Sequence, residues 1–244
     1  MKECSKSISR RLQDSNFVRK YFVGNGIDIG GKPDPLVLYQ SLFPGIASLR
    51  TWDWEDGDAQ FMKGVADNSI DFVFSSHCLE HLHDPYEGLK NWFRIVRPGG
   101  YLIVDIPEED MYEQGIFPST HNKDHKTSWT VLKDKSWSSR SINVLDLVRS
   151  LGSAADIRKI EVIDALFRSD LPRYDQTITP VAECAIEFII RKRNESELKA
   201  GGLLPDTIQP VPEVRRHLNQ YKNDKSTLRT ANPENPPFLD EKDI

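Results

Sequence analysis

The sequence predicts an α/β fold built on a mostly parallel sheet. Two short apolar runs, at residues 72–74 and 101–104, are flanked by polar residues, as is typical of buried strands. Between them, residues 89–96 place apolar side chains at helical spacing, and the Pro-Gly-Gly segment at 98–100 stops that helix. A strand–helix–strand unit of this kind joins two parallel strands through a right-handed crossover.

The other predicted elements complete the same class. Pro35 suits the first turn of a helix that carries Leu36 and Phe43. Apolar runs predict four further strands, at residues 26–29, 47–52, 157–163 and 184–190. A further helix is predicted at 141–151, where Gly152 follows as the stop signal. Ligands of parallel sheets bind where such strands end, so Ser75 and His77 are expected at a binding site.

Residues 71–105 resemble the second half of a class I S-adenosylmethionine-dependent methyltransferase. In that family a strand is followed by Leu-Glu-His-Leu, here residues 79–82, and a helix then leads through R-x-x-R-P-G-G, here residues 94–100, into the next strand. The resemblance covers residues 20–193. It implies a Rossmann-like, doubly wound seven-stranded sheet, mostly parallel with an antiparallel last strand. It also implies S-adenosylmethionine as cofactor and S-adenosylhomocysteine as product.

The resemblance places the cofactor at the ends of the first two strands. The turn with Asp28, Gly30 and Gly31 would hold the amino-acid part, although Lys32 and the residues after it replace the family's later glycines. Without the downstream motifs, an ordinary strand-to-helix turn would be the preferred interpretation. Asp53 would accept hydrogen bonds from the ribose hydroxyls, because the two oxygens of a carboxylate match a vicinal diol.

Asp58 and Ala59 resemble the segment that contacts the adenine in this family. Ser75 and His77, after the next strand, are the remaining residues predicted to bind the cofactor. Asp53 and Asp58 are close in sequence, whereas the family has a helix between them, so this region is compressed. The alternative is an exposed acidic turn, although its two tryptophans favour packing against the core or a flat ligand.

A long polar insert after the strand at 101–104 is the expected acceptor side. His125 and then His121 are the candidate general bases, because a histidine of near-neutral pKa can take a proton from a hydroxyl. A metal site that includes Asp124 and a plain solvated loop are the alternatives. Residues 77–81 also fit the zinc-peptidase pattern H-x-x-E-H, but that chemistry needs both histidines on one helix. We predict no metal.

The acceptor prediction favours oxygen over nucleobase nitrogen. The Asn-Pro-Pro-Tyr sequence that marks many amino-methylating enzymes is absent after the strand at 72–74, where Ser-Ser-His-Cys stands instead. The expected activity is therefore O-methylation of a small molecule, with a sugar or saccharide favoured by the polar insert. The alternative is a non-catalytic partner or scaffold of the same fold, which the incomplete glycine motif supports.

Composition limits the remaining possibilities. The 244 residues carry a net charge of −5, which gives no drive toward nucleic acid, and no apolar run could span a bilayer. The three cysteines are scattered and the first residues lack a secretory pattern, which favours a cytoplasmic location. We expect a helical segment at 1–19, the methyltransferase domain at 20–193, and a polar tail at 194–244. We expect one short helix near residues 213–221 of this tail, which is either a disordered end or an arm for homo-oligomer or partner docking.

Overall fold

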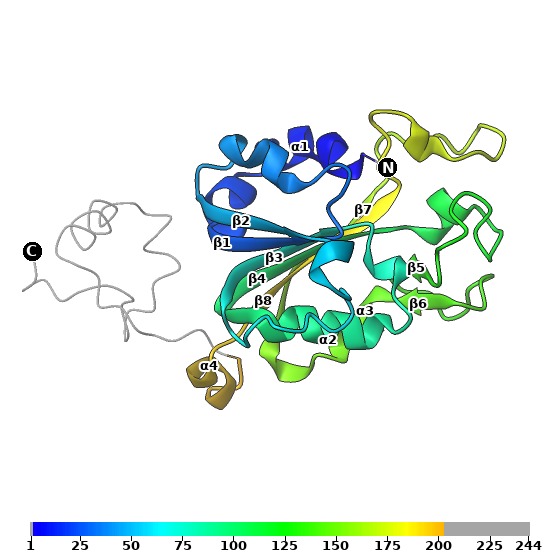
Figure 1. Ribbon diagram of the computed structural model, residues 1–244. Helices are drawn as coiled ribbons and strands as arrows, with labels where there is room; N and C mark the ends of the chain where they lie inside the picture. The colour runs from blue at the N-terminus through cyan, green and yellow to red at the C-terminus, as the bar shows by residue number, and fades with distance from the viewer. Residues whose placement is uncertain (1, 203–244) are drawn as a thin grey trace, which may run out of the picture. The chain divides into compact units, whose positions relative to one another are not determined.

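A six-stranded sheet forms the centre of the computed structural model, which describes residues 2–202 (Figure 1). The strand order is β2-β1-β3-β4-β8-β7, with these bounds: β1 Gly24–Ile29, β2 Ile46–Trp52, β3 Ile70–Ser76, β4 Val96–Pro107, β7 Ala155–Ile163 and β8 Ala185–Lys192. Strands β1 to β4 pair in parallel, whereas β8 is antiparallel to both β4 and β7. The predicted Rossmann-like α/β class and its antiparallel last strand are confirmed.

The sheet has six strands, and the predicted number of seven is wrong. Residues 57–69, between β2 and β3, form turns instead of an edge strand. Side chains of the following helix hold this segment: Trp92 Nε1 donates to the carbonyl of Ala59 at 2.8 Å, and Arg94 donates to the carbonyls of Met62 and Val65. These bonds fix the segment against the helix, so it does not pair with β2. A separate parallel pair consists of β5 Ser128–Thr130 and β6 Ser141–Asn143.

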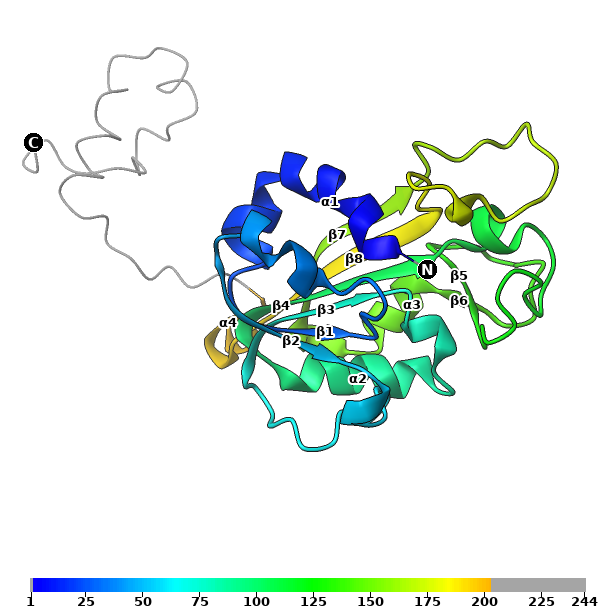
Figure 2. The ribbon, with the colours of Figure 1, turned by 45° about the horizontal axis from the view of Figure 1, so that its top comes forward.

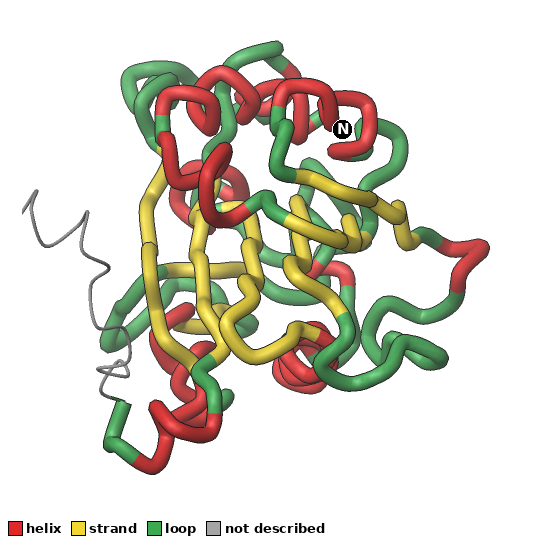
Figure 3. Tube along the Cα trace, turned by 90° about the vertical axis from the view of Figure 1, so that its left-hand side faces the viewer, coloured by secondary structure: helices red, strands yellow, loops and turns green. Residues whose placement is uncertain are grey.

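Helices cover both faces of the sheet and give three layers (Figures 1 and 3). One face carries α1 Glu3–Gln13, the π-helical turn Phe17–Tyr21 and the 3-10 helix Leu36–Leu42, and the other carries α2 Pro85–Ile95 and α3 Val144–Arg149. The remaining short helices are η3 Trp54–Asp56, η4 Leu79–His81, η5 Glu109–Glu113, η6 Gly152–Ala154, η7 Gln176–Ile178 and α4 Glu195–Lys199.

Two apolar cores lie on opposite faces of the sheet, because successive residues of a strand point to opposite faces. In β3, Phe72 and Phe74 pack with the α1 side, whereas Val73 packs with the α2 side. Helix α2 begins at an Asp84 cap, whose carboxylate accepts from the next backbone amides, and buries Trp92 completely. Helix α2 is therefore the crossover that the sequence predicts between β3 and β4.

Helix α1 is fixed to the sheet by a buried cation. The guanidinium of Arg11 is fully buried, forms an ion pair with Asp105 of β4, and lies 3.2 Å from a carboxylate oxygen of Glu187 on β8. Its carbon also lies 4.6 Å from the centre of the Phe74 ring, which adds a cation–π contact. These contacts fix the last turn of α1 to the sheet, and the start of α1 lies near the carboxyl ends of the central strands (Figure 2).

Backbone bonds align the strand ends that form the site. The amide of Gly30 donates to the carbonyl of Trp52 at 2.9 Å, and the amide of His77 donates to the carbonyl of Asp105 at 3.0 Å. Gly30, His77 and the residue after Trp52 therefore share one edge of the sheet.

The predicted polar tail is described only at its start. Helix α4 lies there, whereas the helix expected near residues 213–221 falls outside the described residues. Within residues 2–202, no helix combines the length and the apolar character that a bilayer crossing requires.

Candidate functional site

Two cavities lie at the carboxyl ends of the parallel strands. The smaller, which we name the Glu3 cavity, has a volume of about 160 Å³ and is lined by Glu3 and His77, among others. The larger, which we name the Trp54 cavity, has a volume of about 400 Å³ and includes Trp54 in its wall. Gly30 and His81 line both cavities, so the two spaces adjoin at these residues.

The turn after β1 requires its glycines. Gly30 has a φ of +72°, and a Cβ there would lie 2.7 Å from both Cβ and Sγ of Cys78. A Cβ on Gly31 would lie 2.4 Å from Oδ2 of Asp28. The turn is therefore closely packed on the protein side, and its backbone faces the cavities. This agrees with a cradle for a ligand, although the family's later glycines are missing.

Asp28 packs against Gly31 of that turn and is almost completely buried. Its Oδ2 accepts a hydrogen bond from the amide of Leu36 at 2.7 Å, while its Oδ1 has no hydrogen-bond partner in the structure. Burial raises the pKa of Asp28 to about 7, because the charged form loses its hydration. The carboxyl group thus lines the Glu3 cavity with a free acceptor oxygen.

The Trp54 cavity contains the predicted ribose and adenine residues. Asp53 stands directly after β2 and accepts from the amides of Lys32 at 3.1 Å and Trp54 at 2.9 Å, one on each oxygen. Asp58 and Ala59 also line this cavity. The Trp54 ring is 91% exposed, so it offers a flat apolar face to any ligand in the cavity.

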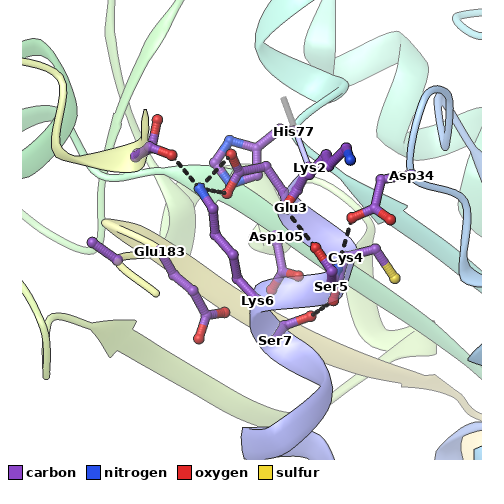
Figure 4. A network of polar contacts seen from close by, with 12 residues as sticks. Lys2, Glu3, Cys4, Ser5, Lys6, Ser7, Asp34, His77, Asp105 and Glu183 are labelled. Carbon is purple, nitrogen blue, oxygen red and sulfur yellow. Dashed lines mark hydrogen bonds and ion pairs between the residues drawn. The ribbon is translucent and has the colours of Figure 1, made fainter. Parts of the chain in front are cut away.

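Helix α1 supplies a carboxylate that the sequence analysis did not select. Glu3 lies beside His77, with Oε2 4.0 Å from Nε2, and accepts from Lys6 Nζ at 2.8 Å (Figure 4). Burial raises the pKa of Glu3 to about 7 against the lowering effect of Lys6. Burial also lowers the pKa of His77 well below its usual value. No local signal marks Glu3, because its partner His77 is distant in sequence.

Ser75 does not reach either cavity. Its hydroxyl is fully buried and donates to the carbonyl of Ile29 at 3.0 Å, which links β3 to β1. We therefore interpret Ser75 as a structural residue, whereas its neighbour His77 lines the Glu3 cavity with a φ of +52°.

The two candidate bases lie in the insert, but neither lines a cavity described above. His125 is buried, and its Nδ1 lies 2.7 Å from Oε1 of Glu113. Burial alone would lower the pKa of His125, but the hydrogen bond to Glu113 and the charge of Glu80 raise it above the usual value. His121 packs edge-on against Tyr112, with ring centres 5.9 Å apart.

His81, which was not predicted as the base, lies where an acceptor and the cofactor could meet. It lines both cavities, and its Nδ1 lies 2.9 Å from Oδ2 of Asp124. Its Nε2 lies 3.9 Å from Oε1 of Glu80, which is fully buried. The Leu-Glu-His-Leu motif contained the signal for His81, since it follows a strand end, but the motif alone does not reveal the partner from the insert.

The zinc-peptidase interpretation of residues 77–81 is not supported by the backbone. That pattern needs two histidines on one helical face, whereas His77 has a positive φ and His81 ends the single 3-10 turn η4.

Residues 43–104 match the family model described as a methyltransferase domain. This stretch contains β2, β3, α2 and most of β4, including Asp53 and His81. The match confirms the resemblance to class I S-adenosylmethionine-dependent methyltransferases, whose cofactor is S-adenosylmethionine. No curated protein gave a sequence match.

Several solved structures resemble the chain. One is a chain from the complex between the Trm112 methyltransferase activator and a methyltransferase of Haloferax volcanii, with 12% identity, a TM-score of 0.47, and coverage of 80% of this chain and 99% of that one. Another is a Thermotoga maritima protein described as a possible histamine N-methyltransferase, with 21% identity, a TM-score of 0.43, and coverage of 75% and 88%. These likenesses identify no acceptor for this chain.

Proposed function

We propose that the chain is an S-adenosylmethionine-dependent methyltransferase that acts on a hydroxyl group of a small molecule, with a sugar or saccharide as the favoured acceptor. The observation that carries the proposal is the pair of cavities that adjoin at Gly30 and His81. Bound S-adenosylmethionine supplies an electrophilic methyl group, so the protein's main task is to position the acceptor oxygen in line and exclude water.

The Trp54 cavity suits the adenosine part of this cofactor. Each oxygen of Asp53 accepts one backbone amide and keeps acceptor capacity for the ribose diol. The exposed ring of Trp54 can stack on the adenine, while Asp58 and Ala59 line the same cavity. At about 400 Å³, the cavity falls in the range of small-molecule sites.

The Glu3 cavity suits the amino-acid end of the cofactor. Gly30 and Gly31 let the chain turn closely beside the ligand, and Asp28, which lines the cavity, keeps one oxygen without a partner that could accept from an ammonium group. Glu3 adds a second carboxyl group at this end, so the cavity favours a cationic group.

We assign to His81 the role of the general base that takes the proton from the acceptor hydroxyl. Nδ1 of His81 lies within hydrogen-bond distance of Asp124, and this contact orients the ring. Nε2 of His81 lies 3.9 Å from Glu80. His125, the base predicted from the sequence, lines neither cavity and is assigned to support Glu80 from the other side.

The favoured acceptor class rests on the polar insert. Asn122 lines the Glu3 cavity, and Asp124 and Lys126 line the Trp54 cavity. These side chains offer donors and acceptors that match a group with several hydroxyls.

Titration calorimetry with S-adenosylhomocysteine tests the cofactor site. The wild-type protein should bind, and Asp53→Ala should abolish binding, while Asp134→Ala is the matched control because Asp134 is exposed and lines neither cavity. Folded wild-type protein that does not bind would contradict the proposal.

Methyl transfer to a panel of acceptors tests the rest. With S-adenosylmethionine present, mass spectrometry should detect methylated saccharides or hydroxylated metabolites rather than methylated amines. Cofactor binding without transfer to any acceptor would instead favour the non-catalytic scaffold that the sequence left as the alternative.

A further inference from the structure

Three side chains converge at the wall of the two cavities: Glu80 and His81 from η4, and His125 from the insert. One possible ligand atom from each of the three side chains lies within 4.8 Å of those of the other two. Oε1 of Glu80 lies 3.9 Å from Nε2 of His81 and 3.9 Å from Nε2 of His125. Two imidazoles and one carboxylate form a frequent donor set for divalent transition metals in proteins.

Each imidazole is oriented by a second carboxylate. Nδ1 of His81 lies 2.9 Å from Asp124, and Nδ1 of His125 lies 2.7 Å from Glu113. A carboxylate at Nδ1 fixes the proton there, which leaves the lone pair of Nε2 free to bind a cation. The ring of Tyr112 stacks on His125 with centres 5.0 Å apart and holds its plane. Both histidines therefore present Nε2 toward Glu80 in an arrangement typical of metal ligands.

Buried polar atoms of this cluster lack partners. Neither oxygen of Glu80 nor Nε2 of His125 has a hydrogen-bond partner, although both side chains are fully buried. A buried carboxylate without a partner is costly, so such atoms point to a missing group. Nδ1 of His77 lies 3.6 Å from Oε1 of Glu80, too far for a good hydrogen bond, and does not satisfy it.

We propose that Glu80, His81 and His125 bind one divalent transition-metal ion of the Zn²⁺ type. Ligand atoms about 2.1 Å from a tetrahedral Zn²⁺ are roughly 3.4 Å apart, so the observed 3.9 Å separations need to close by only about half an ångström. His81 lines both cavities, so the ion would lie close to the wall that they share at this residue.

The metal site consists of the chain's own side chains and does not depend on methyl transfer. Metal binding would engage Nε2 of His81, the atom assigned above as proton acceptor. If the proposed function also holds, metal-loaded and metal-free protein should therefore differ in pH dependence of methyl transfer.

Zn²⁺ titration of protein purified through a chelator tests the proposal. Calorimetry should find one equivalent of Zn²⁺, and Co²⁺ should give the visible absorption bands of a low-coordinate site. Glu80→Gln and His81→Ala should each remove that binding, whereas His83→Ala should retain it, because His83 is an exposed histidine outside the cluster. Glu113→Gln should weaken Zn²⁺ binding by about 10–100-fold, as loss of an orienting carboxylate does.

Separate readouts keep the two proposals apart. Asp53→Ala should lose S-adenosylhomocysteine but keep Zn²⁺, and Glu80→Gln should lose Zn²⁺ while circular dichroism confirms that it is folded. Folded wild-type protein that binds no Zn²⁺, or binding unchanged in Glu80→Gln, would overturn the metal site. Loss of Zn²⁺ binding in His83→Ala would overturn it too, since the metal would then be held elsewhere.

Discussion

Alanine at Gly30 should destabilise the protein and weaken cofactor binding, and Gly64 provides a matched control. Gly30 and Gly64 both have positive φ, +72° and +87°. An L-residue in that region costs about 1–2 kcal/mol, so both substitutions carry this strain. A Cβ on Gly30 would also lie 2.7 Å from Cβ and Sγ of Cys78, whereas a Cβ on Gly64 would meet nothing within 4 Å.

The contact with Cys78 sets the difference between the two variants. Because Cβ of Cys78 is close to the backbone and cannot swing away, the clash adds an overpacking cost of about 1–3 kcal/mol. The free energy of unfolding should therefore fall by about 2–5 kcal/mol in Gly30→Ala and by about 1–2 kcal/mol in Gly64→Ala. In a domain of this size, the difference corresponds to a midpoint shift of roughly 2–12 °C.

Urea denaturation measures the two stabilities, and calorimetry measures binding of S-adenosylhomocysteine. Gly30→Ala should also lose affinity, because Gly30 lines both cavities, while Gly64→Ala should bind like the wild type. Equal destabilisation of the two variants, or unchanged affinity in Gly30→Ala, would refute the argument that this turn is closely packed beside the ligand.

Three further predictions concern charged groups. Arg11→Met should lower the free energy of unfolding by about 3–5 kcal/mol in urea denaturation, because Asp105 stays buried without its cation, and adding Asp105→Asn should recover part of the loss. The charged form of Asp28 grows as the pH rises through its pKa of about 7, so S-adenosylhomocysteine should bind about tenfold more tightly at about pH 8 than at about pH 6 in calorimetry. Asp28→Asn should make that profile shallower, with Glu3, whose pKa is also about 7, giving what remains, and an unchanged slope in this variant would count against the assignment. His81→Asn should lower kcat by about 10²–10⁴ while cofactor binding stays measurable, with a smaller loss in Asp124→Asn, and an unchanged kcat in steady-state assays would exclude His81 as the base.

The central crossover was predictable because its signals are local. Asp84 and Pro85 mark the start of α2, and the spacing of Leu89 and Trp92 defines its buried face. The seventh strand was expected only from the resemblance, and no strand forms in residues 57–69, which are held by side chains of α2 about thirty residues away. Such bonds leave no pattern within the segment itself.

The residues themselves marked the site where it follows a strand end, and the resemblance added Asp58 and Ala59, which also line a cavity. Gly30 and Asp53 stand directly after strands, and both line a cavity. Glu3 comes from another element and reaches the site through tertiary packing. The polar composition of the insert left a solvated loop as an alternative, but His125 is buried because Glu113 and Tyr112 pack against it. Polar residues that satisfy each other are indistinguishable, in sequence, from residues that face water.

The place of β8 in the sheet sets a constraint on how the protein is made. It lies between β4 and β7, although it is the last strand of the sheet in sequence. Residues 101–107 of β4 therefore keep one backbone edge unpaired until residues 185–191 have left the ribosome. An exposed apolar edge readily pairs with other chains. The nascent chain must shield that edge while some eighty residues are still being added, and fragments that stop short of β8 should aggregate.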